Sequence, residues 1–167
     1  PAILFSTLMN TTPNKFEKDV VSIDSIIDAL YDVISNKKGQ SRDWERFKYL
    51  FHHTGRLMSA DKDKDGKIDT RPLTSADFIR WVEPFLLDVG FFEREISRKA
   101  EQYRYIAHVF STYDSKRSKS DEEPFARGIN SIQLLYDEKR WWIISIYYNR
   151  ETKEYPIPRK YLVDKHQ

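Results

Sequence analysis

The stretch that decides the fold starts at Phe91 and reaches Tyr148, where four segments rich in apolar and aromatic residues are separated by polar turns. The segments read FFEREISRKA (91–100), YRYIAHVFSTYD (103–114), FARGINSIQLLYD (125–137) and WWIISIYYN (141–149). Apolar residues occur at both even and odd positions of these segments, which predicts long strands with apolar groups on both faces. One face can pack on the chain's own helices. The other face needs a second cover, and another protein chain is the expected one.

Three helices are predicted before these strands. The first is predicted by apolar residues spaced three and four apart, with Ser22 as N-cap and a stop at 36–39. Its apolar positions are Ile23, Ile26, Ile27, Leu30, Tyr31 and Ile34. A short second helix is expected over 42–51. A third opens at Thr74, where Thr74 and Asp77 have the form of a capping box, and it ends before Gly90.

The segments between and after these elements are predicted as a small hairpin and an extended tail. Residues 55–60 are expected to form a strand, DKDKDG (61–66) a turn, and 67–71 the returning partner strand. The tail EYPIPRKYL (154–162) carries two prolines, so it is expected to run extended along an edge of the sheet.

The order of elements is helices, a small hairpin, a helix and then a long antiparallel meander, which is typical of the α+β class. A curved antiparallel sheet wrapped around three N-terminal helices would form a cone with a hollow inside it. We therefore expect an N-terminal extension over 1–18, with a polar lead-in over 10–18, followed by a single domain over 19–167.

Composition excludes several classes of function. The chain has 167 residues with 28 basic and 26 acidic side chains and a net charge of +2, which favours neither nucleic acid nor an anionic membrane surface as a partner. No apolar run is long enough to span a bilayer. Absence of Cys removes disulfide and thiolate chemistry. The first residues, PAILFSTLMN, are compatible with the remnant of a processed leader, with an expression scar or with a β arm, so the protein is expected to be either cytoplasmic or exported.

Several segments resemble the nuclear transport factor 2-like superfamily, in its SnoaL-like branch. They are ALYDVIS (29–35), DWERFKYLF (43–51), LTSADFIRWVEPFL (73–86) and RGINSIQLLYDEKRWWIISIYYN (127–149). The resemblance covers roughly residues 20 to 150 and implies a cone-shaped, cystatin-like roll. FFEREISRKAEQYRYIAHVFSTYDSKR (91–117) is similar to an uncharacterised bacterial sub-group. The superfamily contains isomerases, dehydratases, hydrolases and binding modules, and no pattern of its isomerases or dehydratases occurs here, so no catalytic role is carried over.

Two motifs suggest metal ligands and neither completes a site. Asp61, Asp63, Asp65 and Gly66 match the first half of a calcium loop, but Pro72 stands where a bidentate Glu is needed, and a hairpin turn explains the same residues. His52 and His53 are adjacent, so they point apart rather than converge on one ion. We predict no metal site and no cofactor.

The meander contains ionisable groups inside otherwise apolar strands, and such groups must be paired, solvated or in a cavity. One hypothesis places them in the cone, with His108 as the candidate proton-transfer residue, Glu95 orienting it and Arg127 holding a substrate oxyanion. The alternative is a Glu95–Arg127 ion pair and a satisfied core histidine. The predicted ligand-pocket residues are Tyr31, Trp81, Glu95, His108, Arg127 and Asn130.

Strand alternation also predicts an interface. Trp141 and Trp142 are neighbours in one strand and must face opposite sides, one toward the core and the other toward the outer face. This favours a homodimer built on the outer face of the sheet.

Three functions remain open on the sequence. The leading one is a SnoaL-like domain that binds a small, mostly apolar molecule in its cone, with no reaction demonstrable from the residues. The second is a cofactor-independent isomerase, cyclase or dehydratase that uses general acid/base chemistry. The third is a dimeric protein-interaction module whose cone is filled by its own side chains.

Overall fold

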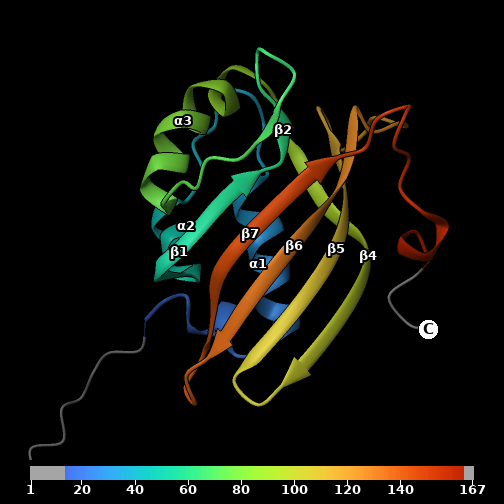
Figure 1. The fold of residues 1–167 in the computed structure, drawn as a ribbon. Coiled ribbons are helices and arrows are strands. Elements are labelled where there is room, and N and C mark those ends of the chain that lie inside the picture. Colours follow the sequence, from blue (N-terminus) through green and yellow to red (C-terminus); the bar gives the residue numbers. More distant parts are fainter. Residues whose placement is uncertain (1–13, 164–167) are drawn as a thin grey trace, which may run out of the picture.

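A curved five-stranded sheet carries three helices on its inner face (Figure 1). The computed structural model describes residues 14–163. The helices are α1 (Ile23–Ile34), α2 (Trp44–Leu50) and α3 (Ser75–Asp88), with short 3-10 helices η1 (Glu17–Val20) and η2 (Arg159–Tyr161). The strands are β1 (Phe51–Ser59), β2 (Asp61–Lys62), β3 (Ile68–Asp69), β4 (Phe92–Tyr103), β5 (Ile106–Lys116), β6 (Ala126–Tyr136) and β7 (Trp141–Arg150).

The large sheet has the order β1-β7-β6-β5-β4, and its last four strands form an antiparallel meander. The predicted strands and the predicted α+β class are confirmed. Trp141 and Trp142 face opposite sides of the sheet, as their burial shows: Trp141 is buried and Trp142 is partly exposed.

The predicted helix starts are confirmed by their caps. Ser22 Oγ accepts from Ser25 N at 3.0 Å, and Ser25 Oγ accepts from Ser22 N at 3.0 Å, so two backbone donors that α1 cannot satisfy internally are bonded. Thr74 and Asp77 form the same reciprocal box at the start of α3. These bonds join residues three apart, so the start of each helix is set locally and does not depend on tertiary contacts.

The predicted hairpin is wrong in its pairing. β1 begins earlier than expected and runs parallel to β7, where Phe51 faces Ile143 and Leu57 faces Ile146. The burial of Phe51 and Leu57 in the core explains this placement, since both apolar side chains lie under the helices. The DKDKDG segment instead closes its own two-residue ladder between β2 and β3.

The core lies between α1 and the inner face of the meander. Its centre is formed by fully buried aliphatic side chains from the helix and from three strands: Ile26, Ile27, Val109, Ile132 and Ile143. Burial of each such side chain contributes about 1.5–3 kcal/mol relative to exposure. α2 packs beside α1, and α2 and α3 pack against each other and against β1, which leaves the wide end of the cone less completely filled.

The C-terminal tail was predicted to run along an edge of the sheet, and this prediction is wrong. The tail crosses the outer face of the sheet, where Thr112 Oγ1 donates to Tyr161 O at 2.7 Å and Ser97 Oγ donates to Val163 O at 2.6 Å. The Tyr161 ring also packs on Phe110 with centroids 5.0 Å apart. The chain itself therefore supplies part of the cover that the outer face was expected to take from another protein.

The N-terminal side is only partly described. η1 begins within the stretch that was predicted as a polar lead-in, and the possible β arm of PAILFSTLMN lies outside the described residues. Within residues 14–163, no helix has the length and apolar character needed to cross a bilayer.

Candidate functional site

A cavity of about 150 Å³ lies at the wide end of the cone, between α3, α1 and the inner face of the sheet. Most of its wall is apolar. The apolar lining comes from Leu30, Ile34, Phe47, Leu57, Phe78, Trp81, Val82, Phe85, Leu86, Phe91 and Ile146. The cone is therefore not completely filled by its own side chains, and the remaining space favours an apolar guest.

The polar end of the cavity is built by strand register. Tyr113 on β5 faces Gly128 on β6, and Gly128 faces Arg150 on β7, so these three form one row across the sheet. The neighbouring inner-face row brings Asn130 opposite Tyr148. Tyr113, Asn130, Tyr148 and Arg150 all line the cavity.

Gly128 is what lets the Tyr113 ring reach this position. A Cβ at residue 128 would lie 2.5 Å from the Tyr113 hydroxyl oxygen and 2.5 Å from Asn149 O. Both distances are shorter than any ordinary contact, so a side chain here would displace the ring. The absence of a side chain at this position thus creates the space that Tyr113 occupies.

Glu93 completes the polar end from β4. Its carboxylate accepts a hydrogen bond from Ser115 Oγ at 2.9 Å. Burial raises the pKa of Glu93 to about 7, while the Ser115 bond and the Arg150 charge act in the opposite direction. A carboxyl group that changes charge near neutral pH therefore lines a mostly apolar cavity.

A chain of buried polar contacts runs behind the cavity. Asn130 Nδ2 donates to the Tyr31 hydroxyl at 3.0 Å, and this hydroxyl lies 2.7 Å from Ser111 Oγ. Ser111 donates in turn to Glu95. Burial raises the pKa of Tyr31 well above its usual value, so the phenol stays protonated and is able to donate.

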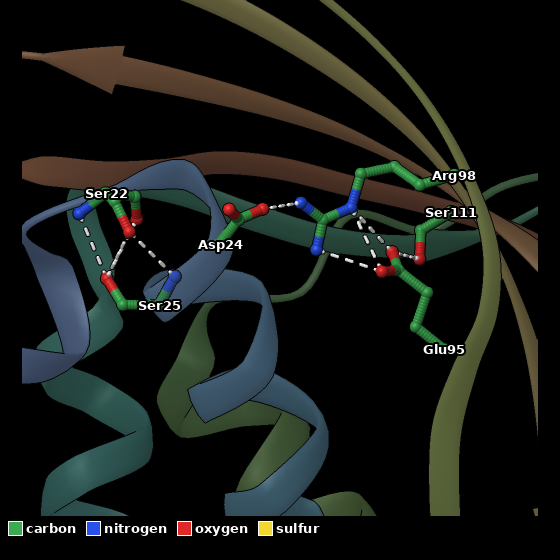
Figure 2. A network of polar contacts seen from close by, with 6 residues as sticks. All are labelled: Ser22, Asp24, Ser25, Glu95, Arg98 and Ser111. Atoms are coloured by element: carbon green, nitrogen blue, oxygen red, sulfur yellow. Dashed lines mark hydrogen bonds and ion pairs between the residues drawn. The ribbon is translucent and has the colours of Figure 1, made fainter. Parts of the chain in front are cut away.

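Glu95 is held by Arg98, which reaches on to Asp24 at the start of α1 (Figure 2). Arg98 Nε lies 3.0 Å from Glu95 Oε1, and Asp24 contacts the other side of the guanidinium. The network therefore joins the exposed Asp24 to Asn130 at the cavity wall and fixes the orientation of the Asn130 amide.

A bulge in β4 makes this arrangement possible. The pairing with β5 shifts between Glu95 and Ser97, so Ile96 is the extra residue. Before the bulge Glu93 and Glu95 face inward, and after it Ser97 faces outward and Arg98 inward. A regular strand would place Glu93, Glu95 and Ser97 on one face, and the bulge breaks this alternation at Ser97.

The structure brings together only some of the predicted pocket residues. Tyr31, Glu95 and Asn130 belong to one inner network, but only Asn130 lines the cavity. Trp81 also lines it, although 64% of this side chain is exposed, which places it at the mouth.

His108 and Arg127 do not join Glu95, so the hypothesis of one acid/base and anion-binding set is wrong. β5 pairs regularly with β6 from residue 106 to 115, which puts His108 on the face opposite Ser111 and Glu95. His108 Nε2 lies 3.1 Å from Ser131 Oγ, and Arg127 pairs with Glu151 at 2.7 Å. The alternative Glu95–Arg127 ion pair is also absent, because each residue has a different partner.

Sequence reasoning missed Glu93, Tyr113 and Arg150. A signal for two of them is present in the sequence, since the alternation of a regular strand puts Tyr113 on the same face as Ser111 and Glu93 on the same face as Glu95. Alternation places both glutamates on one face and does not show which of them borders the cavity.

Possible metal ligands do not converge in the described part of the chain, where no group of three His, Cys, Asp or Glu side chains could hold an ion. The DKDKDG segment is a turn in which Asp63 Oδ1 accepts from the backbone of Asp65 and Lys67, each at 2.9 Å. The expectation that His52 and His53 point apart is wrong, because their ring centroids lie only 4.0 Å apart and the two rings contact each other.

Comparison with known proteins identifies the fold. No family model matches the chain, and no curated protein matches its sequence. Among solved structures, a nuclear transport factor 2-like protein of unknown function from Silicibacter pomeroyi matches with a TM-score of 0.51, 15% identity and coverage of 77% of this chain and 92% of that one. A cystatin-like protein of unknown function from Nostoc punctiforme matches with a TM-score of 0.58, 10% identity and coverage of 80% and 96%.

The fold is that of the nuclear transport factor 2-like proteins. A candidate ketosteroid isomerase from Parabacteroides distasonis has the same fold, with a TM-score of 0.56, 11% identity and coverage of 82% of this chain and 98% of that one. At these identities the similarity shows the nuclear transport factor 2-like fold alone. Any function has to be argued from the cavity itself.

Proposed function

We propose that the protein is a SnoaL-like binding domain that holds one small, mostly apolar molecule in the cavity between α3 and the inner face of the sheet. The observation that carries this proposal is a cavity with apolar walls and a polar group at one end, where Glu93, Tyr113, Asn130 and Arg150 converge. Such a combination gives affinity through apolar burial and orientation through a few polar contacts.

The size of the space limits the guest. A dry apolar cavity of about 150 Å³ can hold a benzene ring. Phe85, which is 48% exposed, and Trp81 border the cavity, so a longer molecule could extend past α3 into solvent. The guest class is therefore an apolar molecule with roughly one ring inside the cone.

Binding of toluene measured by saturation-transfer NMR tests this proposal. Val82 lines the cavity from α3, and Val82→Trp should fill the space and abolish the toluene signal. Leu87→Trp is the matched control on the same helix, at a residue that is outside the lining and should leave binding intact. The proposal fails if toluene does not bind, or if both variants bind it as the wild type does.

Glu93 favours a second candidate, a cofactor-independent enzyme with general acid/base chemistry. Its pKa of about 7 suits a residue that removes and returns a proton at neutral pH, and it borders an apolar cavity. In this role Glu93, rather than the predicted His108, would act on the bound molecule.

Deuterium exchange distinguishes the enzyme from the binder. If Glu93 is a base, the protein should accelerate exchange of the methyl protons of acetophenone in D₂O, and Glu93→Gln should remove that acceleration. His108→Ala is the control, because this residue lies on the other face of β5. Binding of acetophenone without exchange would leave only the binding function.

A homodimer through the outer face of the sheet is part of the same proposal. Support comes from Ile106 and Tyr147, which expose 62% and 42% of their surface there, next to partly exposed Ile129, Leu135 and Trp142. Light scattering should give twice the 20.0 kDa of the chain, and Tyr147→Glu should return it to one chain. Ile68→Glu, at an exposed residue of β3, should not change the mass.

A further inference from the structure

The hydroxyl group of Tyr113 has no hydrogen-bond partner among residues 14–163, although only 4% of the residue is exposed. The comparison is Tyr31, which is equally buried and has two partners, at 2.7 and 3.0 Å. No fully enclosed side-chain polar atom in the described part of the chain lacks a partner, so the Tyr113 oxygen must be accessible from the cavity that Tyr113 lines. A buried hydroxyl without a partner is costly, and a ligand group could satisfy it.

The fold keeps this hydroxyl in place. Gly128 leaves the notch that the end of the Tyr113 ring fills, as the 2.5 Å approach to a Cβ there shows. The pKa of Tyr113 is raised by burial and by the nearby charge of Glu93, so the phenol keeps its proton and is a hydrogen-bond donor. The cavity thus presents one positioned O–H without an acceptor.

An acceptor lies on the adjacent strand. Glu93 and Tyr113 occupy the inner faces of β4 and β5, where Glu95 and not Glu93 is directly opposite Tyr113. Ser115 donates to Glu93 Oε2, which leaves Oε1 as the oxygen that can accept from a guest. Arg150 lines the same cavity, so the two opposite formal charges there balance and favour a neutral guest.

We propose that Tyr113 and Glu93 together bind the hydroxyl group of a neutral, ring-sized apolar alcohol. Tyr113 donates to the hydroxyl oxygen, and Glu93 Oε1 accepts from its hydrogen. A hydroxyl group matches this pair because it both accepts and donates. A ketone would leave Glu93 without a donor, and a carboxylate would place a second negative charge beside it. This assignment rests on the proposed binding function and names its ligand class.

Four probes that share a phenyl ring test the assignment at pH 8, with affinities from NMR titration. They are toluene, benzyl alcohol, acetophenone and benzoate. We expect benzyl alcohol to bind the wild type about tenfold more tightly than toluene, as a net hydrogen bond to each of two groups allows. Tyr113→Phe should remove most of that preference and leave toluene binding within twofold. Tyr147→Phe, on the outer face, should change neither.

The outcomes separate this assignment from the binding function. The assignment is overturned if benzyl alcohol has no advantage over toluene, if acetophenone or benzoate binds most tightly, or if Tyr113→Phe weakens toluene and benzyl alcohol equally. In each of these cases the toluene result leaves the binding function standing. If toluene and the other three probes all fail to bind the wild type, both proposals fall together. Retained toluene binding by Tyr113→Phe also shows that this variant is folded.

Discussion

Glu95 and Arg98 form a buried ion pair along a single strand, with Arg98 Nε 3.0 and 3.1 Å from the two carboxylate oxygens. Residues three apart on a regular strand point to opposite faces. The bulge at Ile96 turns Arg98 to the inner side, where its side chain is 11% exposed and that of Glu95 only 2%. The pair therefore depends on an irregularity of β4 rather than on its regular geometry.

Replacing Arg98 should lower the free energy of unfolding of the protein. Arg98→Met would leave the Glu95 carboxylate buried without its cation, which costs about 3–5 kcal/mol in free energy of unfolding. Urea denaturation followed by tryptophan fluorescence measures this loss. Arg80→Met is the control, because its pair with Asp77 is 72% exposed on the arginine side and should matter little. Equal effects of the two changes would contradict the buried-pair account.

Glu93 should make stability depend on pH in a specific window. Its pKa rises from 4.5 to about 7 on folding, so above pH 4.5 the unfolded chain releases a proton that the folded chain retains. Glu93 should therefore reduce stability progressively from pH 4.5 to 7, by at most about 3 kcal/mol, and no further above that. Glu93→Gln should remove this loss.

The free energy of unfolding of wild type and Glu93→Gln at pH 4.5, 6 and 8 checks the window. Glu45→Gln on the exposed side of α2 serves as control and should follow the wild type at each pH. Parallel curves for wild type and Glu93→Gln would refute the raised pKa.

The C-terminal tail should loosen when one hydroxyl is removed from the sheet. Thr112→Val keeps the shape of the side chain and loses the 2.7 Å bond to Tyr161 O, at a cost of about 1–2 kcal/mol. Hydrogen exchange of the backbone amides over 157–163 should become faster. Thr70→Val, at an exposed site, should have no effect on these amides. Unchanged exchange in Thr112→Val would mean that other contacts hold the tail.

Arg140 should not tolerate lysine. Its guanidinium lies 3.5 Å from the Trp142 ring centroid and 4.0 Å from that of Tyr49, and it donates to Tyr49 O at 2.6 Å. A lysine cannot stack on both rings and also keep the bond to Tyr49 O. Arg140→Lys should therefore lower the melting temperature and reduce the free energy of unfolding by about 1–3 kcal/mol. Arg104→Lys, beside exposed Tyr105, is the control. Equal melting temperatures for the two variants would contradict this.

Local chemistry explains which parts of the fold could be predicted. The caps at Ser22 and Thr74 and the four strands follow from short-range patterns, and the structure confirms them. The pairing of β1 could not be predicted, because a parallel partner far along the chain leaves no local signal.

The site was harder to predict, because its residues depend on strand facing. His108 and Arg127 were predicted as site residues because they are ionisable groups in apolar strands. Both faces of β5 carry apolar residues, so the sequence does not show which face is directed inward. The bulge at Ile96 then turned Ser97 outward and Arg98 inward, which a regular strand would not do. In the sequence, nothing distinguishes Tyr113 from other aromatic residues in strands. Only the packing of its ring against Gly128 shows where its hydroxyl group lies.

The tail that bonds to Ser97 and Thr112 also limits how two copies could assemble. A twofold pair must use the same patch on each molecule. With the tail lying over β4 and β5 at this end, a rotation axis that passed there would bring the two tails into collision. In the proposed homodimer the axis would therefore lie toward the other end of the outer face, over Ile106, Leu135 and Trp142.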